Sequence, residues 1–247
     1  MFRKSFTNPY LSGIDQVQAE DGKKSSFGGI LLKTIYFLVL TGLGAAYAIF
    51  NPFPQYEVYV AIGATAALLI SLLMVWFIRS TVPVAGSIYA LAQGVLGGWA
   101  SVRTANLYNG AVLIALIVTV AIFALLLILY SLGLIRVGNR FKSMSISLLF
   151  GSIMIYGIVY ASSFFTTALT DVFYGDGMLG LVISAAMVLI ASFSLLVDFD
   201  NVSVALKNGL PKKYEWFASF GLVVSLVWLY LKILRFVGQI MAQKNKN

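Results

Sequence analysis

Long apolar stretches of about 20 residues or more recur along the chain and are separated by short polar segments. We place these stretches at residues 28–50, 56–78, 82–101, 110–135, 143–165, 178–206 and 216–240. A helix that crosses a membrane needs about 20 apolar residues. In lipid, a helix also satisfies its own backbone hydrogen bonds. The pattern therefore predicts an all-α, polytopic membrane protein whose fold is a bundle of seven transmembrane helices.

Turn-forming residues separate the apolar stretches. Proline, glycine and asparagine gather at residues 51–54, 175–177 and 208–211, where they favour turns. We expect three parts: a polar cytosolic tail (1–27), a transmembrane domain (28–240) and a short polar C-terminal tail (241–247). Residues 1–27 lack the apolar run and the cleavage site of a signal peptide, so we expect this tail to be retained.

Composition strengthens the membrane assignment. Of the 247 residues, 60% are hydrophobic and 11% are charged, whereas a soluble domain carries about 25% charged residues. Cysteine and histidine are both absent, which disfavours thiol or imidazole metal sites and serine–histidine catalysis. We therefore expect a non-enzymatic protein with no cofactor and no resident metal.

The basic residues indicate orientation rather than nucleic-acid binding. The net charge is +8, but the 17 Lys and Arg residues lie mainly at the ends of apolar stretches. With the N-terminus inside, eleven of them fall in cytosolic segments and three in outer segments, Arg103 among the three. Cytosolic loops are normally the richer in Lys and Arg. We therefore expect the N-terminus in the cytosol and the C-terminus outside.

Small residues recur every four positions in the third apolar stretch. Gly86, Ala90, Gly94 and Gly98 form this stripe, with Gly97 beside it. Such stripes let membrane helices approach closely, so we interpret this one as a helix-packing surface. The alternative, a backbone lining for an ion path, has no other support in the sequence.

Asp198 is the acidic residue that most suggests function. If its helix continues to Lys207, it lies about 13 Å from the helix end, within the inner third of the membrane. An ionisable group at such depth is costly and is kept mainly where it faces a polar interior or a partner. The alternative is that the apolar run ends at Val197, which would leave Asp198 at the lipid headgroup boundary.

A polar stripe accompanies Asp198. Helical spacing places Ser184, Ser194 and Asn201 on its side of the helix,. Asp200 points about 200° away, and we expect it to neutralise Lys207 or another cation on the cytosolic side.

The helix after the turn carries further charges. Glu215 lies close to Lys212 and Lys213, and we expect an interfacial, solvated carboxylate. Lys232 and Arg235 lie three residues apart near the outer end, where the favoured interpretation is snorkelling toward the headgroups. Residues equally far from Pro211 should lie at similar depth, which puts Val224, and Ser225 next to it, level with Asp198.

Several segments resemble the Bax inhibitor-1/YccA-like family of membrane proteins. The similar segments are residues 89–98, 133–137 with Arg140 and Phe141, and the block 196–200, 211–216 and 229–235. Asn8 and Pro9 in the tail are similar to one bacterial branch, which implies a bacterial cytoplasmic membrane.

The resemblance implies a seven-helix bundle with its last helix near the centre. It also implies a calcium-permeable leak gated by protonation of two membrane aspartates or, in some bacterial members, modulation of a membrane-bound protease. Asp198 matches the first aspartate, but the second falls on Val224, and Gln93 stands where this branch often carries a carboxylate. Any pH response would then have to arise from Asp198 alone, or from Asp200 or Glu215 moving toward it.

Three functions compete at this point. The leading hypothesis is a cation leak, with Ca²⁺ as a permeant ion, Asp198 as the titrating group, and Asp200 and Glu215 as further ion-pathway residues. The alternative is a protein that binds a membrane protease or another membrane protein, through the tail and the loop 136–142. An intramembrane hydrolase is the third, because paired aspartates can in principle perform acid–base chemistry.

Overall fold

Eight α-helices make up almost all of the described chain. The computed structural model describes residues 24–51, 54–175 and 177–244. The helices are α1 Phe27–Phe50, α2 Glu57–Phe77, α3 Val82–Leu107, α4 Ala111–Ser131, α5 Asn139–Ser162, α6 Ala168–Tyr174, α7 Met178–Lys207 and α8 Tyr214–Lys244. Short 3₁₀ turns at Pro54–Tyr56 and Arg79–Thr81 lie on either side of α2. The all-α prediction is confirmed.

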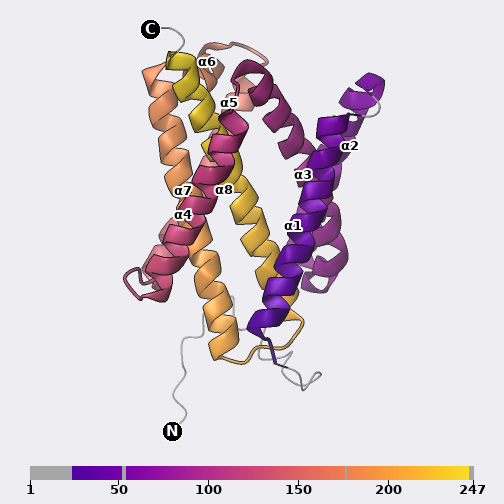
Figure 1. Cartoon of the computed structure of the whole chain (residues 1–247), viewed down its shortest axis with the longest axis vertical. Helices are drawn as coiled ribbons and strands as arrows, with labels where there is room; N and C mark the ends of the chain where they lie inside the picture. Colours follow the sequence, from indigo (N-terminus) through magenta and orange to yellow (C-terminus); the bar gives the residue numbers. More distant parts are fainter. Residues whose placement is uncertain (1–23, 52–53, 176, 245–247) are drawn as a thin grey trace.

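Six of these helices are long and apolar enough to cross a membrane: α1, α2 (with the preceding turn), α4, α5, α7 and α8. The third predicted span, α3, has 26 residues but is rich in glycine and polar side chains, and it is not among the six. The chain is therefore a multi-pass membrane protein. A seventh crossing by α3 stays a prediction, although α3 runs the height of the bundle between the ends of α2 and α4 (Figure 1).

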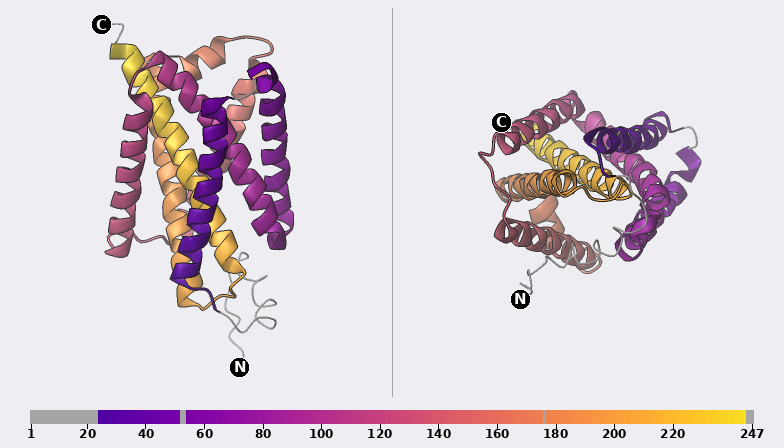
Figure 2. Two further views of the ribbon diagram at one scale, coloured as in Figure 1. Left: turned by 45° about the vertical axis from the view of Figure 1, so that its right-hand side comes forward. Right: turned by 90° about the horizontal axis from the view of Figure 1, so that it is seen from below.

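Helix α8 lies in the middle of the bundle, as the resemblance implied. It packs against α1, α3, α4 and α7, and Figure 2 shows it surrounded when the molecule is viewed from below. Two buried apolar clusters flank it. One joins α8 to α4 and α7 around Leu195 and Leu229, and the other joins α8 to α1 and α3 around Phe37 and Phe220.

Helices α1 and α3 pack closely because small residues face each other. A Cβ atom on Gly94 would lie 2.1 Å from the Thr41 carbonyl oxygen, and one on Gly44 would lie 2.3 Å from that of Leu91. Gly98 meets Ala45 and Ala48 in the same way. The stripe thus lies in a helix interface, where Gly86 faces Phe37 and Phe220, Ala90 is buried, and Gly97 approaches Leu231.

Several predicted boundaries were wrong. Helix α4 ends at Ser131 rather than at residue 135, because the chain turns through Gly133 at a φ of +71°. Arg103, expected in an outer connection, lies within α3. Helix α8 continues to Lys244, so residues 241–244 belong to the helix and not to a tail. Most of the predicted N-terminal tail, and residues 245–247, lie outside the described part of the chain.

Candidate functional site

Asp198 lies in α7 and its carboxylate faces α8. Its Oδ2 accepts a hydrogen bond of 2.5 Å from the Ser225 hydroxyl. Its Oδ1 lies 3.0 Å from the position that a Cβ on Gly221 would occupy. Gly221 and Ser225 are one helical turn apart and therefore lie on one face of α8. The glycine leaves room for the carboxylate, and the serine binds it.

No second carboxylate is paired with Asp198 in the described residues. Val224, which stands where the resemblance implied the second aspartate, packs in the apolar cluster around Phe37 and Phe220. The neighbouring residue, Ser225, contacts Asp198 instead. Counting residues from Pro211 had placed both Val224 and Ser225 level with Asp198, but it could not show which of the two faces the carboxylate.

Asp200 points to a different set of helices. Its Oδ1 accepts a 2.9 Å hydrogen bond from the Tyr130 hydroxyl of α4. Its Oδ2 forms a 2.6 Å ion pair with Lys142 of α5. The cation partner is thus Lys142 and not Lys207, which the sequence had suggested first. Asp200 fastens α7 to α4 and α5, on the side of α7 away from Ser225.

The predicted polar stripe along α7 is not joined into one network. Ser184 is buried and donates to the Leu181 carbonyl oxygen at 2.9 Å. Ser194 donates to the Ile190 carbonyl oxygen at 3.3 Å. Asn201 accepts a 3.4 Å hydrogen bond from Lys142. The two serines therefore bond within their own helix, and Asn201 belongs with Asp200.

Glu215 is fully buried, so the expectation of a solvated carboxylate was wrong. Its relative exposure is 0%, and its Oε2 forms an ion pair with Lys33 of α1. Its Oε1 accepts hydrogen bonds from the Ser26 backbone N–H at 2.9 Å and from the Ser26 hydroxyl at 3.2 Å. Lys212 and Lys213, next to it in the sequence, are exposed. The sequence could not show that the start of α1 covers this residue.

The segment before α1 lies against the turn between α7 and α8. We call residues 24–26 the N-terminal strap. The Ser25 backbone N–H donates to the Leu210 carbonyl oxygen at 2.7 Å, and its hydroxyl lies 2.8 Å from that oxygen and 2.9 Å from the Pro211 carbonyl oxygen. Lys24 forms an isolated antiparallel bridge with Pro211. Sequence analysis missed this contact; its only local signal is Ser26, which also caps α1 by accepting from the Gly29 N–H.

Lys232 and Arg235 are directed at neighbouring helices, whereas the sequence had favoured snorkelling. Lys232 donates to the Tyr156 hydroxyl of α5 at 2.9 Å and lies 4.0 Å from the centre of its ring. Arg235 donates to the same hydroxyl at 3.3 Å and to the Phe173 carbonyl oxygen of α6. These cations therefore tie the C-terminal half of α8 to α5 and α6.

Gln93 is buried in α3, and its Oε1 makes no hydrogen bond within the described residues. Asp198, Asp200 and Glu215 lie at separate contacts. In the described part of the chain, no group of three or more acidic side chains could hold a metal ion. The site is thus one carboxylate between two helices, flanked by two structural ion pairs.

Comparison with known proteins agrees with this architecture. The family described as Bax inhibitor 1 like matches residues 8–242, which is nearly the whole chain. No curated protein matches the sequence. The match covers α1 to α7, with the α7 segment that carries Asp198, and all but the last two residues of the central α8. The chain belongs to the Bax inhibitor 1 like family.

Proposed function

We propose that this protein is a non-enzymatic, pH-sensitive leak for calcium and other cations through the helix bundle, with Asp198 as its titrating group. The observation that carries the proposal is the contact of Asp198 with Ser225, between two helices that are both long and apolar enough to cross a membrane. An ionisable side chain placed between transmembrane helices is a functional candidate by default, because burying it without a role is costly.

The hydrogen bond between Asp198 and Ser225 helps to hold α7 against α8 in the closed state. When these helices separate, the carboxylate becomes available to a cation that has lost part of its water shell. Carboxylate oxygens are the ligands that Ca²⁺ prefers. Protonation of Asp198 removes the charge that attracts the cation. Because Val224 replaces a second carboxylate, we expect the pH response to follow the binding of a single proton.

Ion flux into proteoliposomes tests the proposal. Purified protein should pass Ca²⁺. The flux should fall as the pH is lowered, with the steepness expected for the binding of one proton to Asp198. Asp198→Asn should abolish the flux or make it insensitive to pH. Ser225→Ala removes the hydrogen bond between the two helices but not the carboxylate, so it should raise the flux at pH values where Asp198 is ionised. Asp171→Asn on the exposed face of α6 and Ser194→Ala are matched controls that should change neither property. A folded protein that passes no cation at any pH would refute the leak.

We also propose that the protein resides in a bacterial plasma membrane, with its N-terminus in the cytosol and its C-terminus outside. The start of α1 and the α7–α8 turn share one end of the bundle, as the strap contacts require, while α8 finishes at the opposite end (Figure 1). The strap end carries the Lys-rich segments, which normally remain on the cytosolic side.

A second candidate function is binding of a membrane-bound protease or another membrane protein. It is favoured by the exposed Arg136 in the α4–α5 turn and the exposed Arg140 in the first turn of α5, which are not engaged in the ion pairs described. A partner that docks there should co-purify in detergent and be lost from Arg136→Gln/Arg140→Gln. Deleting residues 1–23, which leaves the strap in place, tests the contribution of the tail. Failure of any stoichiometric partner to co-purify would argue against this role.

A further inference from the structure

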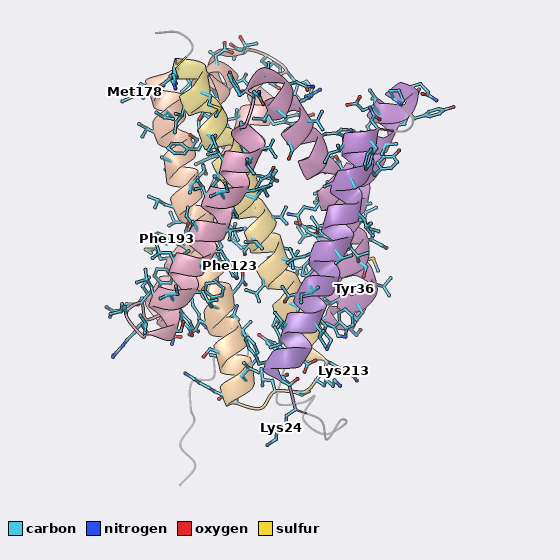
Figure 3. All side chains as sticks on the ribbon, in the orientation of Figure 1. Lys24, Tyr36, Phe123, Met178, Phe193 and Lys213 are labelled. Atoms are coloured by element: carbon cyan, nitrogen blue, oxygen red, sulfur yellow. The ribbon has the colours of Figure 1, made fainter. Side chains whose placement is uncertain are left out.

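Four lysines surround the turn between α7 and α8 and are all exposed. Lys207 ends α7, Lys212 and Lys213 precede α8, and Lys24 comes from the strap, far away in the sequence. Figure 3 shows Lys24 and Lys213 at the same end of the bundle. We call these four residues the lysine cluster.

Lys24 is held in the cluster by specific contacts. Its backbone pairs with Pro211, and Ser25 beside it bonds to the Leu210 carbonyl oxygen. Its aliphatic part lies over Gly209, where an added Cβ would be 3.1 Å from the Lys24 Cδ atom. Gly209 has a φ of +59°, which glycine adopts without strain,. The turn therefore fixes the position from which the lysine extends.

In the described part of the chain, the acidic residues near the lysine cluster are engaged with other partners. Glu215 is buried and paired with Lys33, Asp200 is paired with Lys142, and Asp198 is bound by Ser225. The Glu215–Lys33 and Asp200–Lys142 pairs are the ion pairs found within the described residues, and neither includes a lysine of the cluster. Within residues 24–51, 54–175 and 177–244, none of the four positive charges of the cluster is thus paired with a carboxylate.

An apolar surface begins directly beside this charge. Phe27 and Leu31, one turn apart at the start of α1, are 65% and 48% exposed, and Leu32 next to them is 70% exposed. In a membrane, this face of α1 lies against acyl chains while the lysines lie at headgroup level. The combination of clustered ammonium groups and an adjoining apolar face suits an amphiphilic anion better than a small soluble one.

We infer that the lysine cluster binds the phosphate of an anionic phospholipid headgroup, with an acyl chain of that lipid along the exposed face of α1. Basic side chains near a membrane surface attract anionic lipids, each contributing additively to the affinity. The bound lipid would bridge the strap and the α7–α8 turn, two segments that the fold already joins.

Native mass spectrometry of the detergent-purified full chain tests the inference. Phosphatidylglycerol is titrated against phosphatidylcholine, and retained lipids are counted. The original protein should retain phosphatidylglycerol selectively. Lys212→Gln/Lys213→Gln should weaken that binding about thirtyfold. Arg136→Gln/Arg140→Gln removes the same charge around the α4–α5 connection, one of the other connections at this end, and should have little effect. Lys24→Gln, which changes one exposed side chain, should weaken the binding of phosphatidylglycerol several-fold. This single variant replaces the double variant in the test if the double variant does not fold.

Three results would overturn the inference. The first is equal retention of phosphatidylglycerol and phosphatidylcholine. The second is equal weakening by the lysine and arginine variants, which would show a general effect of charge. The third is displacement of the lipid by millimolar inorganic phosphate, which would show that the cluster recognises the free anion.

Discussion

At the scale of single residues, the most unusual group is Glu215, a carboxylate with 0% exposure whose partners all come from the start of α1. Removing one member of a buried ion pair is far more costly than removing a surface charge, because the remaining charge loses its compensation. Lys33 keeps 15% of its side chain exposed, which moderates this cost.

Glu215→Gln should therefore lower the free energy of unfolding by about 3 kcal/mol, the low end of the range for such changes. The measurement is denaturant unfolding in detergent micelles. Glu57→Gln, which changes a carboxylate outside any described ion pair, should cost less than about 0.5 kcal/mol. Equal effects of the two substitutions would show that the Lys33 pair does not stabilise the fold.

Sequence reasoning identified Asp198 but misjudged its surroundings and those of its neighbours. The position of Asp198 on an apolar helix could be derived from hydropathy and the stop signals after Lys207. The burial of Glu215 and the pairing of Asp200 with Lys142 depend on α1 and α5, which are distant in the sequence. Helical periodicity gives the direction of a side chain but not the helix that it meets.

At the scale of helices, the contact of α1 with α3 depends on the absence of side chains. The Cβ that an alanine would place at Gly94 lies 2.1 Å from a backbone oxygen, which cannot move without shifting α1 as a whole. The periodic small residues predicted a packing surface on α3. They could not name α1 as the partner, since small residues such as Gly63 and Ala67 also occur in α2.

Gly94→Val should separate α1 from α3 and lower the free energy of unfolding by about 1–3 kcal/mol, the usual cost of overpacking. Thermal unfolding in detergent measures the change. Gly157→Ala in α5 is the matched control, because an added Cβ there meets nothing within 4 Å. That variant should be as stable as the original protein or slightly more stable, since alanine favours helix. Destabilisation by the control alone would contradict the packing argument.

At the scale of the whole molecule, the helix order fixes which connections share an end. The described residues place the strap beside the α7–α8 turn, while α8 finishes at the other end (Figure 1). Hydropathy alone could locate the apolar helices. The central position of α8 could be expected only from the family resemblance, because the sequence of one helix does not show how many neighbours surround it.

The absence of cysteine from the chain makes its orientation directly measurable. Asn208→Cys and Lys244→Cys each introduce one exposed thiol, at opposite ends of the bundle. In intact spheroplasts, a membrane-impermeant maleimide should label the Lys244→Cys variant. It should label the Asn208→Cys variant only after permeabilisation. The reverse result would invert the proposed orientation, and labelling of both variants in intact spheroplasts would exclude a crossing by α8.

Helix α8 is anchored near both of its ends. At its start, Glu215 is bound to Lys33 and Ser26. Near its finish, Arg235 and Gln239 donate to the carbonyl oxygens of Phe173 and Gly175, on and just after α6. Because both of its ends are held by these contacts, α8 cannot shift or tilt as a rigid helix without breaking them. Any movement of α8 away from α7 must therefore come from bending of the segment between these two ends, which contains Gly221 and Ser225.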